Sequence, residues 1–235
     1  MAVLALGVVF LLSKWKEASD HGGQLPRKPF RIAGNLYYVG TRDVTSFLLT
    51  SPQVHVLIDG GYPGTAPMIL KSIATLGFNI RAVKILLNSH AHFDHAGGLA
   101  ALQQASGAKL WANEQDAHIL ESGGATDPTS GSFRVLAHLG LVYPPPRVDY
   151  RFQDGAQIRL GPILLTAHPE PGHTPGCTTW GFPVQDKGRE LLAVLATDMV
   201  VLPTASLVAP EAYPGIRAEF EHSFNVLRSP PTDIT

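Results

Sequence analysis

The sequence predicts an α/β protein in which two β-sheets lie face to face and helices cover their outer sides, a four-layer αββα sandwich. Two observations predict this fold: short strand patterns alternate with amphipathic helix patterns, and they fall into two halves of similar make-up. Sheets and helices with one apolar side become stable by stacking in layers around a core. The chain has 235 residues, of which 45% are hydrophobic, so it can bury one substantial core.

In the first half, apolar strand patterns are followed by turns or by helix patterns. The clearest helix is predicted at residues 66–76, because apolar side chains such as Ile69 and Ile73 share one face and Gly77 follows. The predicted elements are, in order, strands at residues 36–39, 46–50 and 54–59, the helix at 66–76, a strand at 83–87, a helix at 98–105, a strand at 109–112 and a helix at 114–121. The first three strands indicate an antiparallel meander.

A turn-rich segment at residues 123–132 and the run Tyr143-Pro144-Pro145-Pro146, which cannot be helical, separate the two halves. The second half is predicted to contain strands at residues 150–152, 157–160, 163–168, 178–182 and 191–196 and a final helix at 215–227. In such a sandwich, the loops that carry chemistry are expected along one edge.

Charge and cysteine content exclude some functions. The formal net charge is −1, and no run of Lys or Arg exists that could neutralise a row of phosphates, so nucleic acid is not an expected partner. Cys177 is the single cysteine, so no intrachain disulfide can form. No feature of the sequence indicates a protein partner.

The N-terminal segment is apolar over residues 1–12. It is too short to span a membrane, but it suits the apolar region of a secretion signal. A buried strand or helix is the alternative. We therefore expect residues 1–20 to be a signal or an apolar N-terminal segment, one domain over residues 29–235, and a periplasmic or secreted location.

The sharpest motif is His90-Ala91-His92-Phe93-Asp94-His95, which follows the apolar strand predicted at residues 83–87. In an extended loop, His90 and His92 point to the same side and can share one metal ion, while Asp94 and His95 turn toward a neighbouring one. Imidazoles and a carboxylate are ligands that suit Zn²⁺. Exposed loop histidines, or a metal site without catalysis, are the alternatives.

This HxHxDH motif resembles the signature of the metallo-β-lactamase superfamily. The family has a later histidine, and Pro171-Gly172-His173-Thr174-Pro175-Gly176 supplies one at the matching place. Further segments resemble subclass 3 of the class B β-lactamases: Ile32-Ala33-Gly34-Asn35-Leu36-Tyr37-Tyr38-Val39-Gly40-Thr41, Leu57-Ile58-Asp59-Gly60-Gly61, Ile85-Leu86-Leu87-Asn88-Ser89, Tyr143-Pro144-Pro145 and Ser223-Phe224-Asn225-Val226-Leu227-Arg228.

The resemblance implies an αββα metallo-β-lactamase fold with two Zn²⁺ ions. His90, His92 and His173 would bind the first ion, and Asp94 and His95 the second. A metal-bound hydroxide, with its proton oriented by Asp94, would attack the amide of a small β-lactam. The implied function is antibiotic resistance by β-lactam hydrolysis.

The sequence departs from the subclass 3 pattern in two places. A histidine that binds the second zinc is expected a few residues past the segment 223–233, and Thr235 is the last residue, so we expect a truncated domain or a weaker second site. Met199 stands where the family usually has serine, next to Asp198, an aspartate that bridges both metals in other members. The alternative functions are therefore a lactonase or thioesterase, or an inactive metal-binding fragment.

Three further residues near these motifs carry expectations of their own. Asp59 could accept a hydrogen bond from a metal-binding imidazole or could cap a turn. His168 is expected to be structural. Cys177 is expected to be a small packed residue rather than a nucleophile, since a reactive thiol needs an electropositive partner and a base.

Overall fold

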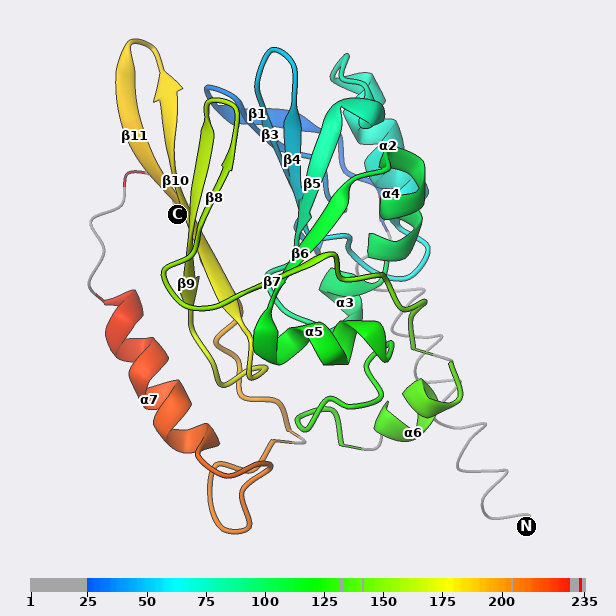
Figure 1. Cartoon of the computed structure of the whole chain (residues 1–235), viewed down its shortest axis with the longest axis vertical. Coiled ribbons are helices and arrows are strands. Elements are labelled where there is room, and N and C mark those ends of the chain that lie inside the picture. The colour runs from blue at the N-terminus through cyan, green and yellow to red at the C-terminus, as the bar shows by residue number, and fades with distance from the viewer. Residues whose placement is uncertain (1–24, 132, 141, 204, 229–232, 234–235) are drawn as a thin grey trace.

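The computed structural model describes residues 25–131, 133–140, 142–203, 205–228 and 233. These residues form a seven-stranded sheet next to a four-stranded sheet, with helices on the outer sides (Figure 1), and the predicted αββα sandwich is confirmed. The expectation for residues 1–20 falls outside the described residues. None of the helices in the described part of the chain is long and apolar enough to cross a membrane.

The seven-stranded sheet runs in chain order: β1 (Phe30–Ala33), β2 (Leu36–Tyr38), β3 (Phe47–Thr50), β4 (His55–Ile58), β5 (Val83–Leu87), β6 (Lys109–Asn113) and β7 (Tyr150–Phe152). β2 to β4 form the predicted antiparallel meander, and β1 adds a further antiparallel strand to it, whereas β4 to β7 pair in parallel. Parallel neighbours need crossover connections, and the helices α2 (Ala66–Thr75), α4 (Leu99–Ser106) and α5 (Glu114–Glu121) lie in these connections.

The four-stranded sheet has the order β11-β10-β9-β8 and is antiparallel throughout. Its strands are β8 (Gln157–Leu160), β9 (Ile163–Pro169), β10 (Thr178–Asp186) and β11 (Arg189–Leu195). The last helix, α7 (Ile216–Leu227), lies on the side of this sheet that faces away from the seven-stranded sheet (Figure 1).

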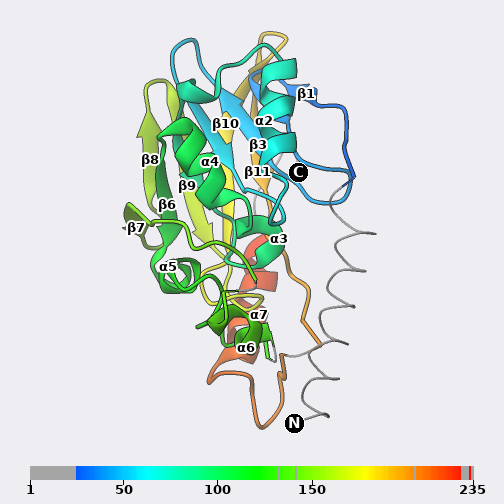
Figure 2. The ribbon, with the colours of Figure 1, turned by 90° about the vertical axis from the view of Figure 1, so that its right-hand side faces the viewer.

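Two cores hold the layers together. Between the sheets, Ile58 and Leu87 from the first sheet pack with Trp180 and Phe182 from the second, and all four are almost completely buried. The second core lies between the seven-stranded sheet and the helices α2, α4 and α5, which cover the outer face of that sheet (Figure 2). All four residues of β4 are buried, as expected for a strand covered on both faces.

Several elements differ from the sequence prediction. The strand β1 was not predicted, because its first two residues are exposed and the segment shows no clear alternation. The short helices η1 (Ile80–Ala82) and α6 (Phe133–His138) were not predicted either, since helices of three to six residues have too few turns to show a periodic apolar face. A further short helix, α3 (Phe93–Ala96), replaces part of the loop expected to carry the histidine motif.

Candidate metal centre

The motif residues His90 and His92 reach the site from the end of β5. After Leu87 the chain bends at Ser89 and again at Ala91 and His92, and His92, with φ −73° and ψ 156°, is the N-cap residue of the short helix α3. These bends place the imidazole rings of His90 and His92 next to each other, with their centroids 5.0 Å apart. Ala91, between them, is buried.

His173 comes from the loop between β9 and β10, in the second sheet. Gly172 precedes it with φ +136°, and a Cβ atom at this position would lie 2.8 Å from the Phe220 ring of α7. Only glycine fits such a backbone at such a close approach. The loop therefore passes tightly over α7 and carries His173 toward the motif of the first sheet.

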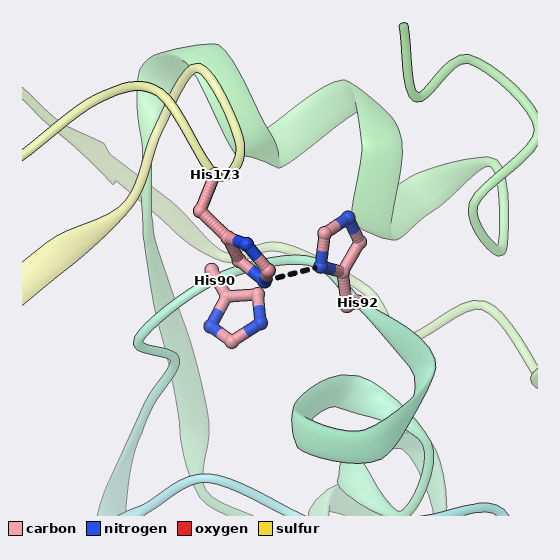
Figure 3. Close-up of side chains that lie close together, drawn as sticks. All are labelled: His90, His92 and His173. Carbon is pink, nitrogen blue, oxygen red and sulfur yellow. Dashed lines mark hydrogen bonds between the residues drawn. The ribbon is translucent and has the colours of Figure 1, made fainter. Parts of the chain in front are cut away.

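The three imidazoles converge (Figure 3). His92 Nδ1 lies 2.9 Å from His173 Nε2, and one nitrogen from each of His90, His92 and His173 falls within 4.8 Å of the others. All three side chains are buried. The expected set of first-site residues is therefore brought together by loops from both sheets.

The inner nitrogens of this cluster face one another and have no hydrogen-bond partner outside it among the described residues. His90 Nε2 is buried without a hydrogen-bond partner. The outer nitrogens of the other two imidazoles are engaged: His92 Nε2 lies 3.0 Å from Asp127 Oδ2, and His173 Nδ1 lies 2.6 Å from the Val200 carbonyl oxygen. An acceptor on one ring nitrogen fixes the proton there and leaves the other nitrogen as a ligand. The residues fit a metal ion.

Electrostatics also favours neutral, ligating imidazoles in this cluster. Burial and the neighbouring histidines lower the pKa of His90 well below its ordinary value, and burial and His92 lower the pKa of His173. Burial alone would raise the pKa of Asp127, but hydrogen bonds from His92, Ser130 and Thr129 outweigh burial and bring this pKa to about 2. Asp127 is therefore an anion at neutral pH, placed behind His92.

A second group of possible ligands adjoins the first. Ligand atoms of His90, His95 and Asp198 also lie within 4.8 Å of one another. His95 Nε2 is 3.8 Å from Asp198 Oδ2 and 3.8 Å from Asp94 Oδ2. The structure thus brings the expected pair of Asp94 and His95 together, and it places Asp198 beside them.

The Asp59 carboxylate is hydrogen-bonded to this second group and to the residues before it. Its carboxylate accepts hydrogen bonds from the Ser89 amide (2.7 Å), the Ser89 hydroxyl (2.7 Å), Asn88 Nδ2 (3.1 Å) and His95 Nδ1 (2.9 Å). Burial would lower the pKa of His95, yet Asp59, and less strongly Asp94 and Asp198, raise it to about 9. Of the two roles considered for Asp59, the structure shows the one in which its carboxylate holds an imidazole, that of His95; its other bonds go to Asn88 and Ser89 after β5.

The remaining sequence expectations have clear outcomes. Cys177 is fully buried, its sulfur accepts hydrogen bonds from Thr174, and burial raises the pKa of the thiol to about 12, so it is a packed thiol and not a nucleophile. His168 lines a separate cavity on the second sheet. Asp127 and Asp116 were not predicted as site residues, because an aspartate in a turn or a first helical turn normally serves as a cap.

Comparison with known proteins identifies the family. Residues 39–186 match the metallo-beta-lactamase superfamily, and this segment contains the whole HxHxDH motif and His173. The chain belongs to the metallo-β-lactamase superfamily. The prediction of this family is therefore confirmed.

The chain is similar to solved structures along most of its length. It is 40% identical to the native FEZ-1 metallo-beta-lactamase from Legionella gormanii, with a TM-score of 0.84, covering 92% of this chain and 80% of that one. It is 32% identical to BJP-1, a subclass B3 metallo-beta-lactamase of Bradyrhizobium japonicum, with a TM-score of 0.83, covering 92% of this chain and 78% of that one. The resemblance to subclass 3 is confirmed.

The chain also resembles curated proteins that are named hydroxyacylglutathione hydrolases. It is 28% identical over 142 residues to a hydroxyacylglutathione hydrolase of Jannaschia sp., covering 60% of this chain and 44% of that protein. The chain therefore spans less than half the length of this relative.

Proposed function

We propose that this chain is a zinc-dependent hydrolase that opens the amide bond of the four-membered β-lactam ring. The observation that carries the proposal is the convergence of His90, His92 and His173 beside a cavity of about 570 Å³, which His92 and His173 line. The similarity to metallo-β-lactamase structures over 92% of the chain supports the substrate class. Imidazole-rich, partly enclosed sites are typical of catalytic Zn²⁺.

The proposed ligand sets follow from the side chains that converge. His90, His92 and His173 would hold the first ion, and Asp94 and His95 would hold the second. Zinc supplies Lewis acidity and a water whose pKa is near 7. The Asp59 carboxylate keeps the proton of His95 on Nδ1, so Nε2 faces the site.

Other residues of the chain would bind and orient the substrate. Phe93, Val142 and Leu202 give the cavity an apolar wall, which suits the carbon substituents of a small ligand. Asp94 also lines the cavity, with a side chain that is 28% exposed. We propose that Asp94 orients and accepts the proton of the attacking water, because a carboxylate at this position can do both.

Hydrolysis of a glutathione thioester is the second candidate function. Asp198 favours it, because its carboxylate lies beside His95 as a bridging ligand would, and curated hydroxyacylglutathione hydrolases are similar in sequence. Charge opposes it. Among the described residues that line the cavity there is no Lys or Arg, whereas Asp94, Asp127 and Asp198 are present. Glutathione carries two carboxylates and a fused-ring β-lactam carries one, so a surface of like charge disfavours the glutathione thioester more strongly.

Turnover and metal content of the purified protein test the proposal. We expect hydrolysis of nitrocefin and of a carbapenem that stops on removal of zinc by a chelator and returns when zinc is added. Hydrolysis of lactoylglutathione without β-lactam turnover would replace the first candidate by the second. Zinc binding with neither activity would identify a metal-binding fragment.

The variant Asp198→Asn separates the two candidates further. In the β-lactamase arrangement the second ion depends on Asp94 and His95, so the variant should keep both ions and most of its β-lactam turnover. In the thioesterase arrangement the variant should lose the second ion. Metal content by mass spectrometry gives the result.

We also propose a periplasmic or secreted location. The apolar residues 1–12 support it as the core of a secretion signal. Recovery of the protein from the periplasmic fraction of a bacterial host, with its N-terminus cleaved within roughly the first 30 residues, is the expected result. An uncleaved protein in the cytoplasmic fraction would contradict it.

A further inference from the structure

Asp116 joins the two loops that carry the first metal site. It lies in the first turn of α5 and is 1% exposed. Its Oδ2 accepts hydrogen bonds from the Ala91 amide (2.8 Å) and the Thr174 hydroxyl (2.7 Å), and its Oδ1 accepts one from the Gly176 amide (2.8 Å). One buried carboxylate therefore holds a residue of the HxHxDH loop and two residues of the His173 loop.

The positions of these three donors matter because they flank metal-binding histidines. Ala91 lies between His90 and His92, and Thr174 directly follows His173. The carbonyl oxygen of Ala91, in the peptide group that joins it to His92, accepts a hydrogen bond from the buried Tyr143 hydroxyl at 2.8 Å. The peptide groups on both sides of Ala91 are therefore held, and neither can rotate without breaking a buried hydrogen bond, which would cost about 1–3 kcal/mol.

The packing of the His173 loop against α5 is equally close. A Cβ atom at Gly176 would lie 2.6 Å from the Asp116 backbone nitrogen and 2.7 Å from its Cβ, so glycine is required there. Besides the contact between His92 Nδ1 and His173 Nε2, a backbone hydrogen bond from the Thr178 amide to the Ser89 carbonyl oxygen at 2.8 Å links the same regions. That bond lies outside the segment between the histidines, so it does not orient the Ala91 peptide.

We propose that Asp116 is a positioning residue of the first metal site: by holding the Ala91 amide and the Thr174–Gly176 turn on one carboxylate, it fixes the loop separation at which His90, His92 and His173 share an ion. The inference rests on the proposed metal-dependent function. Ligands that are held in place before binding give up less freedom on binding, so loss of this link lowers the metal affinity.

Only an ionised carboxylate can fill this role. The two backbone N–H groups of Ala91 and Gly176 point at different oxygens of Asp116, and a carboxylate accepts on both oxygens, whereas an asparagine side chain has one acceptor oxygen and one NH₂ donor. In Asp116→Asn, one backbone amide would face that NH₂ group. The loop on that side would be released while the size of the side chain stays the same.

The test compares first-ion binding in the wild type, Asp116→Asn and Thr174→Val. Zn²⁺ affinity is measured by competition with a chromophoric chelator, and Co²⁺ is used as a spectroscopic probe of the ligand geometry. Burial raises the pKa of Asp116 to about 6, so both measurements are made at about pH 7.5, where the carboxylate is ionised.

We expect Asp116→Asn to weaken first-ion binding by about ten- to a hundred-fold and to change the visible absorption of bound Co²⁺. Thr174→Val removes one of the three donors and leaves both backbone bonds, so a smaller loss in the same direction is expected. It also serves as the second variant where Asp116→Asn does not fold.

The matched control is Asp149→Asn. Asp149 is a half-buried aspartate whose carboxylate accepts a hydrogen bond from the Leu110 amide at 3.1 Å and pairs with Lys109 and Arg147, away from the site. This control should unfold more easily than the wild type and should bind the first ion normally.

The inference is overturned if Asp116→Asn, or Thr174→Val in its place, binds Zn²⁺ with wild-type affinity and an unchanged Co²⁺ spectrum. Asp116 would then have a structural role only. A wild-type protein that binds no ion overturns the proposed function itself. The two failures are distinguishable because no β-lactam turnover enters the measurement.

Discussion

Asp127 reaches His92 from a turn 35 residues further along the chain, and its carboxylate accepts a hydrogen bond from the imidazole nitrogen that faces away from the metal site. Such a carboxylate fixes the tautomer of the ligand and increases its basicity. We expect Asp127→Asn to weaken Zn²⁺ binding by about ten- to a hundred-fold, measured by competition with a chelator. Ser130→Ala is the control, because it removes a hydroxyl that donates to the same carboxylate and leaves His92 engaged. Equal affinities in Asp127→Asn and the wild type would contradict the prediction.

Glu170 gives a prediction about pH. Its side chain is 1% exposed, and burial raises its pKa from 4.5 to about 6, with the Thr179 hydroxyl donating to Oε2 at 2.7 Å. Because the folded-state pKa of Glu170 lies above its unfolded value, the stability that its protonated carboxyl contributes is fully present below pH 4.5. This contribution is lost as the pH rises through 6. A glutamine side chain at this position would be neutral at every pH and could still accept from Thr179. We therefore expect Glu170→Gln to raise the free energy of unfolding by about 2 kcal/mol at about pH 8.

Urea denaturation at about pH 8 and about pH 4.5, with equal zinc in all samples, measures this effect. The gain should shrink toward zero at the lower pH, where the wild-type carboxyl is protonated in the folded state and about half protonated in the unfolded state. Glu190→Gln is the control, since Glu190 is an exposed residue of β11 and its substitution should change stability little at either pH. A gain for Glu170→Gln that is the same at both pH values would show that charge is not its cause.

At the scale of single residues, the sequence predicts the metal-facing side chains better than the side chains that hold them. His90 and His92 are recognised by their spacing within one motif and His173 by the glycine-rich turn around it, and both signals are local. Asp127 and Asp116 act through partners 25 to 60 residues away. Their roles depend on how α5 and the turn after it pack, which local patterns do not contain.

At the scale of elements, long or fully buried segments are predicted well and short exposed ones are not. The helices α2, α5 and α7 were predicted to within two residues at each end, because an apolar face, an N-cap residue or a following glycine marks them. The single turn of α3 was not predicted. It forms because His92, at the N-cap position, has an extended backbone and its carbonyl oxygen accepts a hydrogen bond from the Ala96 amide at 2.8 Å. This turn separates Asp94 and His95 from the group of His90, His92 and His173.

The contact between the His173 loop and α7 gives a prediction at the same scale. An alanine in place of Gly172 would be strained at φ +136°, and its Cβ would meet the Phe220 ring at 2.8 Å. We expect Gly172→Ala to lower the free energy of unfolding by about 3 kcal/mol and to weaken zinc binding, because the displaced loop carries His173. Chemical denaturation and chelator competition measure the two effects.

Gly188→Ala is the matched control for this variant. Gly188 lies in the β10–β11 turn with φ +77°, and a Cβ atom there would meet no other atom within 4 Å. Its substitution should lower stability by about 1 kcal/mol and leave zinc affinity unchanged. If both variants lose the same stability and bind zinc equally well, the contact with Phe220 does not position the loop.

At the scale of the whole molecule, the candidate metal site lies where the two sheets meet. His90 and His92 follow β5 of the seven-stranded sheet, whereas His173 follows β9 of the four-stranded sheet. The apolar core between the sheets holds their faces together, but at this edge the contacts are polar and pass through Asp116 and the histidines. An ion bound here would link both sheets, so metal binding and folding should be coupled.

This coupling predicts a large effect of metal removal on stability. A ligand present at about 1,000 times its Kd stabilises the folded state by about 4 kcal/mol, which for a chain of this size corresponds to a rise in Tm of about 10 °C. We therefore expect a chelator to lower the Tm of the wild type by about this amount in scanning calorimetry. His173→Ala should unfold near the temperature of the chelated wild type and should not respond to zinc, because the link between the sheets is lost. The control is His118→Ala, which changes an exposed histidine of α5 outside the site and should keep the full rise in Tm on zinc binding. If zinc raises the Tm of His173→Ala as much as that of His118→Ala, the ion does not join the sheets through His173.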